Sequence, residues 1–395
     1  MNILFVHEVF GSCGGAESNA LATAAELQER GHRVGLLTQR GTGKNEEAWE
    51  ELFGGDLFRL DDGAERAVAE FEPDVLYVHK WEHLASLEGF LRGRCPLVRM
   101  VHDHDSYCLR SYRYNPLTRK PCTRPAGLHC VVPCLAPLKR NRGGLLPVRW
   151  ASYFDKQREI ALTRRFDRSI VATEFMKREL LINGFDAGRI SVVPPVPRPA
   201  EPLRSSFSER NLVLFAGQII RGKGVDVLLR SLAQVRGRFE AVIVGDGNHR
   251  AACERLSRKL GLADRVTFQG FVPQPELRKF YREASVVVVP SVWPEPMGLV
   301  GLEAMRNALP VVAFDAGGIS AWLRDGENGF LVPWMNEPQF ARRIGDLLAD
   351  KALARAMGER GLERANRDFD FDRYIDSLET LFGSVAPERR PLCAA

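Results

Sequence analysis

The chain lacks an apolar run long enough to cross a membrane. A membrane-spanning helix needs roughly 18 or more consecutive apolar residues, and no stretch of the 395 residues approaches that length. Residues 1–7 contain neither the basic segment nor the long apolar segment of a signal peptide. We therefore expect a cytoplasmic protein whose cysteines are reduced.

Two nucleotide-binding motifs are present only in incomplete form. Residues 11–17, GSCGGAE, form a glycine loop between an apolar strand and a helix, but they lack the G-x-G-x-x-G spacing of NAD-binding proteins. Residues 217–224, GQIIRGKG, come close to the Walker A pattern, but Gly224 occupies the position where Ser or Thr holds Mg²⁺. These departures count against an NAD enzyme and against an ATPase.

The composition is that of a globular protein with an uneven charge. Hydrophobic residues make up 45% of the chain and charged residues 27%, as in ordinary folded domains. A chain of this length suits two domains. The net charge of +5 is mild, but residues 110–170 hold fourteen Lys or Arg against three acidic residues.

Short apolar stretches alternate with helical patterns along the chain, which predicts two doubly wound α/β domains. The predicted strands lie at residues 2–6, 34–38, 75–78, 97–101, 169–172 and 190–193, and then at 212–216, 240–244, 266–269, 286–289 and 311–314. Five prolines within residues 194–202 separate the two series, and so many prolines favour a linker over regular structure.

These patterns set the expected domain boundaries. We expect a first domain over residues 1–194 with a Cys- and Arg-rich insertion at about 107–147, a linker at 195–205, a second domain over 206–366, a C-terminal helix at 367–386 and a disordered tail at 387–395.

The most informative stretch is residues 290–305, PSVWPEPMGLVGLEAM, which follows a fully apolar strand. Pro294 and Pro296 force a loop, and a helix can begin at Gly298. The N–H groups at a helix start favour anions. Glu295 in the loop and Glu303 in the helix bracket that start with seven residues between them.

The pair Glu295-x7-Glu303 in this setting resembles the signature of the retaining glycosyltransferases of family 4. The resemblance extends over roughly residues 1–385. It implies the GT-B fold, in which two doubly wound, Rossmann-like domains face each other across a cleft and the last helix crosses back to the first domain. It also implies a nucleotide diphosphate sugar donor, UDP- or GDP-linked. The basic residues 110–170 indicate an anionic or membrane-borne acceptor, so we expect a glycan or lipid-linked acceptor and a role in cell-surface polysaccharide synthesis.

The resemblance also assigns roles to particular residues. Glu303 would bind the ribose hydroxyls, whereas Glu295 and His102 would position the donor sugar. Lys223 would bind the diphosphate, and Arg221 would replace the arginine that the family carries where this chain has Gln218. The other implied donor contacts are Gly14, Gly15, Gly217, Gly245, Val272, Pro296, Met297, Gly298 and Leu299.

In the implied reaction, closure of the cleft excludes water, and the cations and the helix start stabilise the departing diphosphate. The resemblance implies a front-face substitution in which the leaving phosphate takes the acceptor proton. No protein nucleophile and no catalytic cofactor are then required.

Four cysteines fall within 27 residues of the insertion: Cys108, Cys122, Cys130 and Cys134. A structural zinc held by all four thiolates is one interpretation, because metal would stabilise a loop of little apolar content. Unligated thiols, disulfides and an iron–sulfur cluster are the others. Asp103 and Asp105 also form a D-x-D pattern, so a metal bound by His and Asp at this point stays open.

Aromatic residues alternate with cations in a predicted helix at about residues 147–165. This pattern indicates a contact with an anionic membrane surface, at the inner face of the membrane, or an anionic acceptor. A solvated helix whose aromatic residues pack inward is an equal alternative. Nucleic acid is disfavoured because no recognition motif accompanies the charge.

Two further classes of function stay open from the sequence. One is a non-catalytic nucleotide-binding or P-loop-like protein, which the near Walker A pattern favours. The other is a GT-B sugar-nucleotide epimerase, which would act on the donor without an acceptor.

Overall fold

A computed structural model describes residues 1–11, 14–115, 117–140, 148–198 and 208–386. The chain divides into two compact units. The first comprises Met1–Ser111, Thr123–Arg198 and Phe371–Ala395, and the second comprises Tyr112–Cys122 and Pro199–Asp370. Across the part of the chain that the structure describes, no helix has the length and apolar character of a membrane span.

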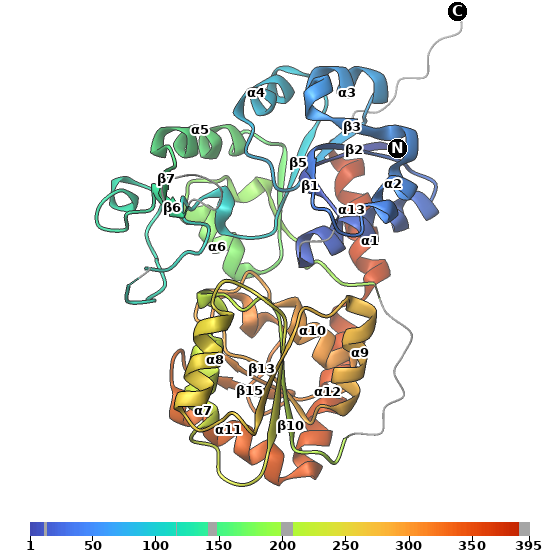
Figure 1. Cartoon of the computed structure of the whole chain (residues 1–395). Coiled ribbons are helices and arrows are strands. Elements are labelled where there is room, and N and C mark those ends of the chain that lie inside the picture. Colours follow the sequence, from blue (N-terminus) through green and yellow to red (C-terminus); the bar gives the residue numbers. More distant parts are fainter. Residues whose placement is uncertain (12–13, 116, 141–147, 199–207, 387–395) are drawn as a thin grey trace, which may run out of the picture. The chain divides into compact units, whose positions relative to one another are not determined.

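The first unit contains, within the described residues, a parallel sheet of seven strands in the order β3-β2-β1-β4-β5-β8-β9. Strands β1, β2, β3 and β5 of this sheet are labelled in Figure 1. Its strands are β1 (Asn2–Phe10), β2 (Arg33–Gly41), β3 (Leu57–Arg59), β4 (Val75–Val78), β5 (Leu97–Val101), β8 (Arg168–Val171) and β9 (Ile190–Val192). Its helices are α1 (Gly15–Glu29), α2 (Glu47–Phe53), α3 (Ala64–Phe71), α4 (Leu84–Arg92), α5 (Tyr153–Thr163), α6 (Glu174–Ile182) and α13 (Phe371–Val385). Strand β1 lies between β2 and β4, so that Ile3 pairs with Val34 and with Val75.

The second unit contains, again within the described residues, a parallel sheet of six strands in the order β12-β11-β10-β13-β14-β15. Its strands are β10 (Leu212–Ala216), β11 (Glu240–Val244), β12 (Val266–Gly270), β13 (Val286–Val289), β14 (Val311–Phe314) and β15 (Gly329–Val332). Its helices are α7 (Val225–Leu232), α8 (Arg250–Lys259), α9 (Gln274–Glu283), α10 (Leu299–Arg306), α11 (Glu337–Ala349) and α12 (Lys351–Asp368). Every residue of β13 is buried, as expected for a parallel strand with helices on both faces of the sheet.

The predicted α/β class and the two doubly wound units are therefore confirmed. Each of the eleven predicted strands overlaps an observed one. In the two parallel sheets, strands β3 and β15 were not predicted, because β3 has only three residues and β15 begins at a glycine. The parts of the predicted linker and tail at residues 199–205 and 387–395 lie outside the described residues.

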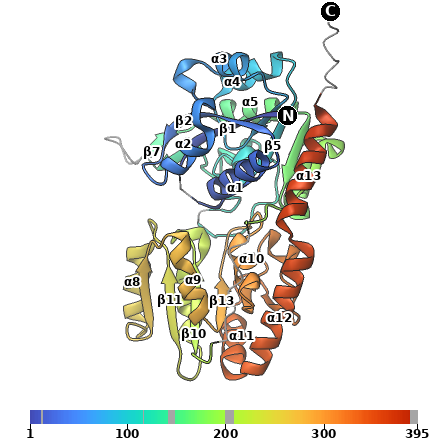
Figure 2. The ribbon, with the colours of Figure 1, turned by 90° about the vertical axis from the view of Figure 1, so that its right-hand side faces the viewer.

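The last helix, α13, belongs to the first unit although the chain reaches it from the second. Helix α13 lies beside α1 (Figure 2). The Tyr374 hydroxyl of α13 lies 3.1 Å from the Thr23 hydroxyl of α1. Arg30, which follows α1, donates to Glu379 at 2.8 Å. The ring of Phe382 lies 5.0 Å from that of Tyr77 in β4. Helix α13 therefore completes the core of the first unit, as the predicted return of the last helix requires.

The inserted region differs from the prediction in two ways. The prediction assigned the whole insertion to the first domain, but Tyr112–Cys122 lies in the second unit. There Arg119 forms a bidentate ion pair with Asp226 of α7. The helix predicted at 147–165 is also shorter, since Val148–Trp150 forms strand β7, which pairs in antiparallel fashion with β6 (Leu138–Arg140). Helix α5 begins only after Ser152, whose hydroxyl accepts from the Asp155 N–H.

Replacing Phe382 with alanine tests the contribution of α13. Phe382 is fully buried, and removing such a ring costs about 3–5 kcal/mol of unfolding free energy through lost burial and the cavity left behind. The control is Thr380→Ala on an exposed position of the same helix, which should change stability by less than about 0.5 kcal/mol. Urea unfolding measures both variants, and equal stabilities would contradict the docking of α13 in this core.

Candidate active site

The start of helix α10 is fixed by its backbone and by one tryptophan. Gly298 adopts a left-handed conformation with φ of 81° and caps the helix. The Trp322 indole N–H donates to the Met297 carbonyl at 2.6 Å. A Cβ atom at Gly301 would lie 2.1 Å from the Trp322 ring, so only glycine lets the ring pack there. The predicted contacts Pro296 and Met297 are buried, while Gly298 and Leu299 are half-buried.

A buried ion pair joins this loop to the loop after β10. Glu295 is 2% exposed, and the Lys223 ammonium contacts its two carboxylate oxygens at 2.7 and 3.0 Å. The Ser291 hydroxyl also donates to this carboxylate. The Glu295 backbone is held as well, because its N–H donates to Ala316 and its carbonyl accepts from Gly318.

The loop that carries Lys223 depends on a glycine at its end. Gly224 has φ of 71°, and a Cβ atom there would lie 1.9 Å from the Pro290 carbonyl oxygen. This close approach explains why neither Ser nor Thr completes the Walker A pattern. The Gly222 carbonyl accepts from the N–H groups of Val292 and Trp293, and the Lys223 ammonium lies 5.1 Å from the centre of the Trp293 ring. Of the two predicted cations, Lys223 and Arg221, the structure thus places Lys223 against Glu295.

The other predicted residues of these loops surround the same strand ends. Gln218 and Arg221 both have exposed side chains. Gly217 and Gly245 approach closely, because a Cβ atom at Gly245 would lie 1.9 Å from the Gly217 carbonyl oxygen. Val272 is half-buried in the loop after β12. Carboxyl ends of neighbouring parallel strands form the usual ligand edge of such a sheet.

Glu303 lies on α10 and has a partner that the sequence did not reveal. The Tyr281 hydroxyl of α9 donates to a Glu303 carboxylate oxygen at 2.7 Å. Burial raises the pKa of Tyr281 well above its ordinary value, and the neighbouring Glu303 charge raises it further. Tyr281 therefore keeps its proton throughout the physiological range and orients the carboxylate as a hydrogen-bond donor. In the sequence, Tyr281 is recognisable only as an aromatic residue on the buried side of a helix.

His102, in the first unit, belongs to a row of three histidines. Its Nε2 atom lies 2.7 Å from Nδ1 of His79, and the ring of His7 lies 5.7 Å from that of His79. The three residues come from the neighbouring strands β1, β4 and β5 or from the positions just after them. Burial lowers the pKa of each, and it lowers the pKa of His102 to about 3. All three rings are neutral at pH 7. His7 and His79 were missed, although each ends an apolar run.

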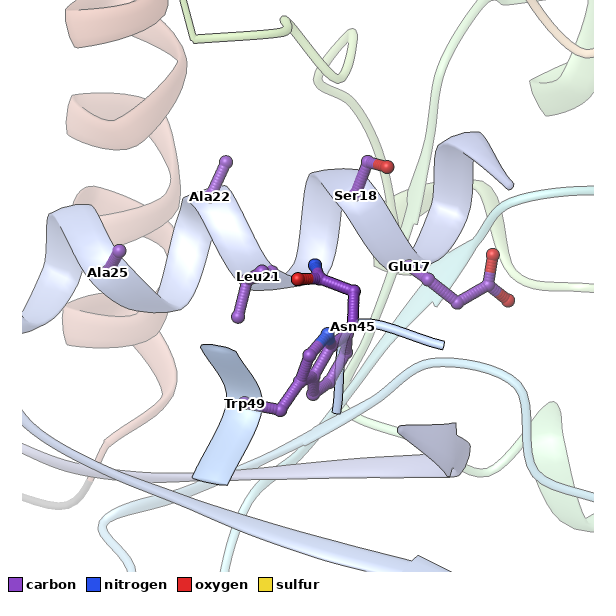
Figure 3. A pocket seen from close by; sticks show the side chains of 7 residues that line it. All are labelled: Glu17, Ser18, Leu21, Ala22, Ala25, Asn45 and Trp49. Atoms are coloured by element: carbon purple, nitrogen blue, oxygen red, sulfur yellow. The ribbon is translucent and has the colours of Figure 1, made fainter. Parts of the chain in front are cut away.

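Gly14 and Gly15 open helix α1, with Gly14 as its N-cap. Next to them, Glu17 is buried and lies 3.9 Å from Nε2 of His7. A pocket of about 290 Å³ begins beside Glu17 and extends between α1 and the segment that leads into α2 (Figure 3). Its lining residues are Glu17, Ser18, Leu21, Ala22, Ala25, Asn45 and Trp49. Glu17, Ser18 and Asn45 are the polar residues of this lining, and the other lining residues are apolar.

The four clustered cysteines are divided between the two units. Cys122 lies in the second unit, whereas Cys108, Cys130 and Cys134 lie in the first. Cys130 is buried in an apolar cluster with Leu109 and Ala136. Among the described residues, no three or more His, Cys, Asp or Glu side chains are placed to hold a metal ion.

The D-x-D pattern has a local explanation. Asp103 pairs with Lys80 at 2.7 Å, and its carboxylate accepts from the Asp105 N–H at 2.8 Å. These contacts use Asp103 to hold the loop after β5. The described residues therefore offer no metal centre at this point either.

Both halves of the chain match models of known families. Residues 13–196 match the model described as Glycosyltransferase Family 4, and residues 201–364 match the model described as Glycosyl transferases group 1.

Curated relatives give a consistent result. A D-inositol 3-phosphate glycosyltransferase of Acidothermus cellulolyticus is 34% identical over 247 residues, which cover 57% of this chain and only 54% of that relative. The protein with the same name in Nocardia farcinica is 29% identical over 401 residues, covering 90% of this chain and 81% of the relative.

Solved structures share the fold. HepE from Anabaena, in complex with UDP and glucose, superposes with a TM-score of 0.75 at 21% identity, over 97% of this chain and 100% of that chain. WaaG, a glycosyltransferase involved in lipopolysaccharide biosynthesis, superposes with a TM-score of 0.69 at 17% identity, over 96% and 99% of the two chains. With the two family models spanning most of its length, the chain belongs to glycosyltransferase family 4 and has the GT-B fold.

Proposed function

We propose that the protein is a retaining glycosyltransferase that moves a hexose from a nucleotide diphosphate sugar, UDP- or GDP-linked, to a glycan or lipid-linked acceptor. The observation that carries this proposal is the buried contact between Lys223 and Glu295 at the start of α10. It places a cation and a helix N-terminus together, and both stabilise a diphosphate leaving group.

The chemistry of Lys223 supports a direct contact with the diphosphate. An ammonium group has three N–H donors, and Glu295 accepts two of these hydrogen bonds. The third donor can point to a phosphate oxygen while the carboxylate holds the side chain in place. Glu295 in this proposal positions Lys223 as well as the sugar.

Glu303 suits the ribose of the nucleotide. A carboxylate offers about four lone-pair sites, so it can accept from the two ribose hydroxyls in addition to Tyr281. The UDP and glucose of the HepE complex support a UDP-linked hexose over the other candidates.

His102 would contribute a hydrogen bond to the donor sugar without adding charge. Its pKa of about 3, lowered mainly by burial, keeps the ring neutral. A neutral ring does not oppose the positive charge that develops on the sugar in an oxocarbenium-like transition state. In the proposed front-face substitution the leaving phosphate takes the acceptor proton, so no protein base is assigned.

The acceptor and the location rest on charge and exposure. Residues 110–170 carry an excess of cations, and Trp150 and Phe154 are 69% and 80% exposed. Exposed aromatic residues beside cations favour an anionic membrane surface. We therefore propose a cytoplasmic enzyme of cell-surface polysaccharide synthesis that contacts the inner face of the membrane. The inositol phosphate in the names of the relatives agrees with an anionic acceptor.

A thermal-shift panel with UDP, GDP, ADP, CDP, ATP and NAD tests the proposal, with each ligand measured in Mg²⁺ and in EDTA. A ligand at 100 times its Kd stabilises the folded state by about 2.7 kcal/mol. Stabilisation by one nucleoside diphosphate in both buffers supports the proposal and identifies the base. Stabilisation only by ATP with Mg²⁺, or only by NAD, contradicts it.

Replacing Glu303 with alanine should weaken donor binding. A hydrogen bond to a charged group contributes about 1.5–3 kcal/mol, so the donor KM should rise about 10- to 100-fold. Tyr281→Phe keeps the carboxylate but removes its orienting bond, and its effect should be smaller. Steady-state kinetics with varied donor measures both. An unchanged KM in Glu303→Ala would rule out this residue as a donor contact.

Lys223→Ala should act on the chemical step. Loss of one group that stabilises developing charge lowers kcat by about 10²- to 10³-fold. Lys259, an exposed lysine of the same unit, gives the matched control Lys259→Ala, which should retain activity. Single-turnover rates at saturating donor separate this effect from binding, and equal rates in the two variants would refute the assignment.

The histidine row predicts how stability depends on pH. Because burial lowers the pKa of His79 and His102, the unfolded chain binds protons that the folded chain does not. Their stabilising contribution is complete above about pH 6.5 and is lost as the pH falls; for His102, whose pKa is about 3, the loss is about 2 kcal/mol at pH 5. His79→Asn should therefore lose less stability than the wild type between pH 7.5 and 5. Urea unfolding at the two pH values measures the difference, and equal losses would contradict the burial of a neutral His79.

A further inference from the structure

The segment Tyr112–Cys122, here called the arm, belongs to the second unit, and its described residues, all but residue 116, form a hairpin. Tyr114 and Pro121 form an antiparallel bridge across it. The Cys122 N–H donates to the Arg113 carbonyl at 2.8 Å. At the turn, the Asn115 side chain accepts from the N–H groups of residues 117 and 118 at 2.9 and 3.0 Å. The arm therefore has a defined local structure of its own.

An ion pair anchors the arm to helix α7. The Arg119 guanidinium donates to the two carboxylate oxygens of Asp226 at 3.2 and 2.7 Å. The two side chains are only 12% and 10% exposed. Burial alone would raise the pKa of Asp226, but the hydrogen bonds and charge of Arg119 lower it below its ordinary value. Arg230 and His249 lie farther from the same carboxylate, at 3.4 and 3.8 Å, so the closest cation of Asp226 is Arg119 on the arm.

Aromatic contacts lead from the arm to the candidate active site. The Tyr112 ring lies 6.3 Å from the Trp293 ring. A Cβ atom at Gly222 would lie 3.5 Å from the Tyr114 ring and 3.3 Å from Trp293, so both side chains pack against the loop that carries Lys223. The Lys223 ammonium in turn lies over Trp293 at 5.1 Å. A continuous series of contacts thus joins Arg119 to Lys223.

We propose that the arm is a wall of the sugar-donor site and that Arg119 is a positioning residue for Lys223. By anchoring the hairpin, Arg119 holds Tyr112 and Tyr114 against Trp293 and Gly222. These contacts keep Lys223 where its third N–H can reach the donor diphosphate. The inference rests on the proposed function, because it takes the Lys223 loop as the binding site of the diphosphate.

This role explains why the arm docks at this place. A hairpin that served only to connect two parts of the insertion could stay in solvent. Instead its anchor is a mostly buried ion pair, and Tyr114 is 9% exposed against the glycine next to Lys223. Lys120, one residue from the anchor, remains exposed and provides a comparison within the same turn.

The test uses the full chain and UDP or GDP, whichever nucleotide stabilises the wild type. Arg119→Ala should raise the nucleotide Kd and the donor KM about tenfold, the size of one charged hydrogen bond, and should lower kcat less than Lys223→Ala does. Arg119→Lys keeps a cation beside Asp226, where Arg230 and His249 forbid a reversed charge, and should restore much of the affinity that Arg119→Ala loses. Lys120→Ala removes a cation from the same turn and should stay within about twofold of the wild type.

A second variant covers the case in which Arg119→Ala fails to fold. Tyr112 is 41% exposed, so Tyr112→Ala should fold normally yet raise the nucleotide Kd, and Tyr112→Phe should bind like the wild type. If the wild type binds a nucleoside diphosphate and the Arg119 and Tyr112 variants bind it equally well, the arm is only structural and the inference is overturned. If the wild type binds none of the nucleotides, the proposed function fails and the inference fails with it.

Discussion

The candidate active site depends on one buried ion pair, between Lys223 and Glu295. A carboxylate that is 2% exposed is tolerated only when a cation and hydrogen-bond donors compensate for its lost hydration. Lys223 and Ser291 supply both. The pair joins the loop after β10 to the loop after β13, and these strands are neighbours in the sheet. The order of the parallel strands thus places the two loops together, and the ion pair fixes the cation that we assign to the diphosphate.

Glycines make this arrangement sterically possible. At Gly224 and at Gly317 the backbone has positive φ, and a Cβ atom would lie within 3 Å of backbone atoms of the facing loop. Such close approach is the main use of glycine at ligand sites. The close approach at Gly224 also distinguishes this loop from a P-loop, which it resembles in sequence. In this chain Gly224 serves a contact with Pro290, not a Mg²⁺ ion, which is why the match to Walker A stops at that residue.

Much of the architecture could be predicted because its signals are local. Buried parallel strands are apolar runs, and each predicted run overlaps an observed strand. The loop with Glu295 could be found because its prolines end the strand and Gly298 begins the helix. The partners of the site could not be found in this way. Tyr281 lies 22 residues from Glu303, and its sequence position predicts only helix packing. The division of the four cysteines between two units also leaves no trace in their spacing.

The sequence by itself determined the fold class, the family and the identity of the residues at the strand ends. The fold class follows from apolar periodicity, whereas the family follows from the resemblance of residues 290–305 to a known signature. Only the tertiary structure decided which charges meet: Lys223 with Glu295, and Arg119 with Asp226. Such pairs join residues 72 and 107 positions apart. They form because strand order and loop closure bring them within hydrogen-bond distance, and no local pattern of residues encodes that distance.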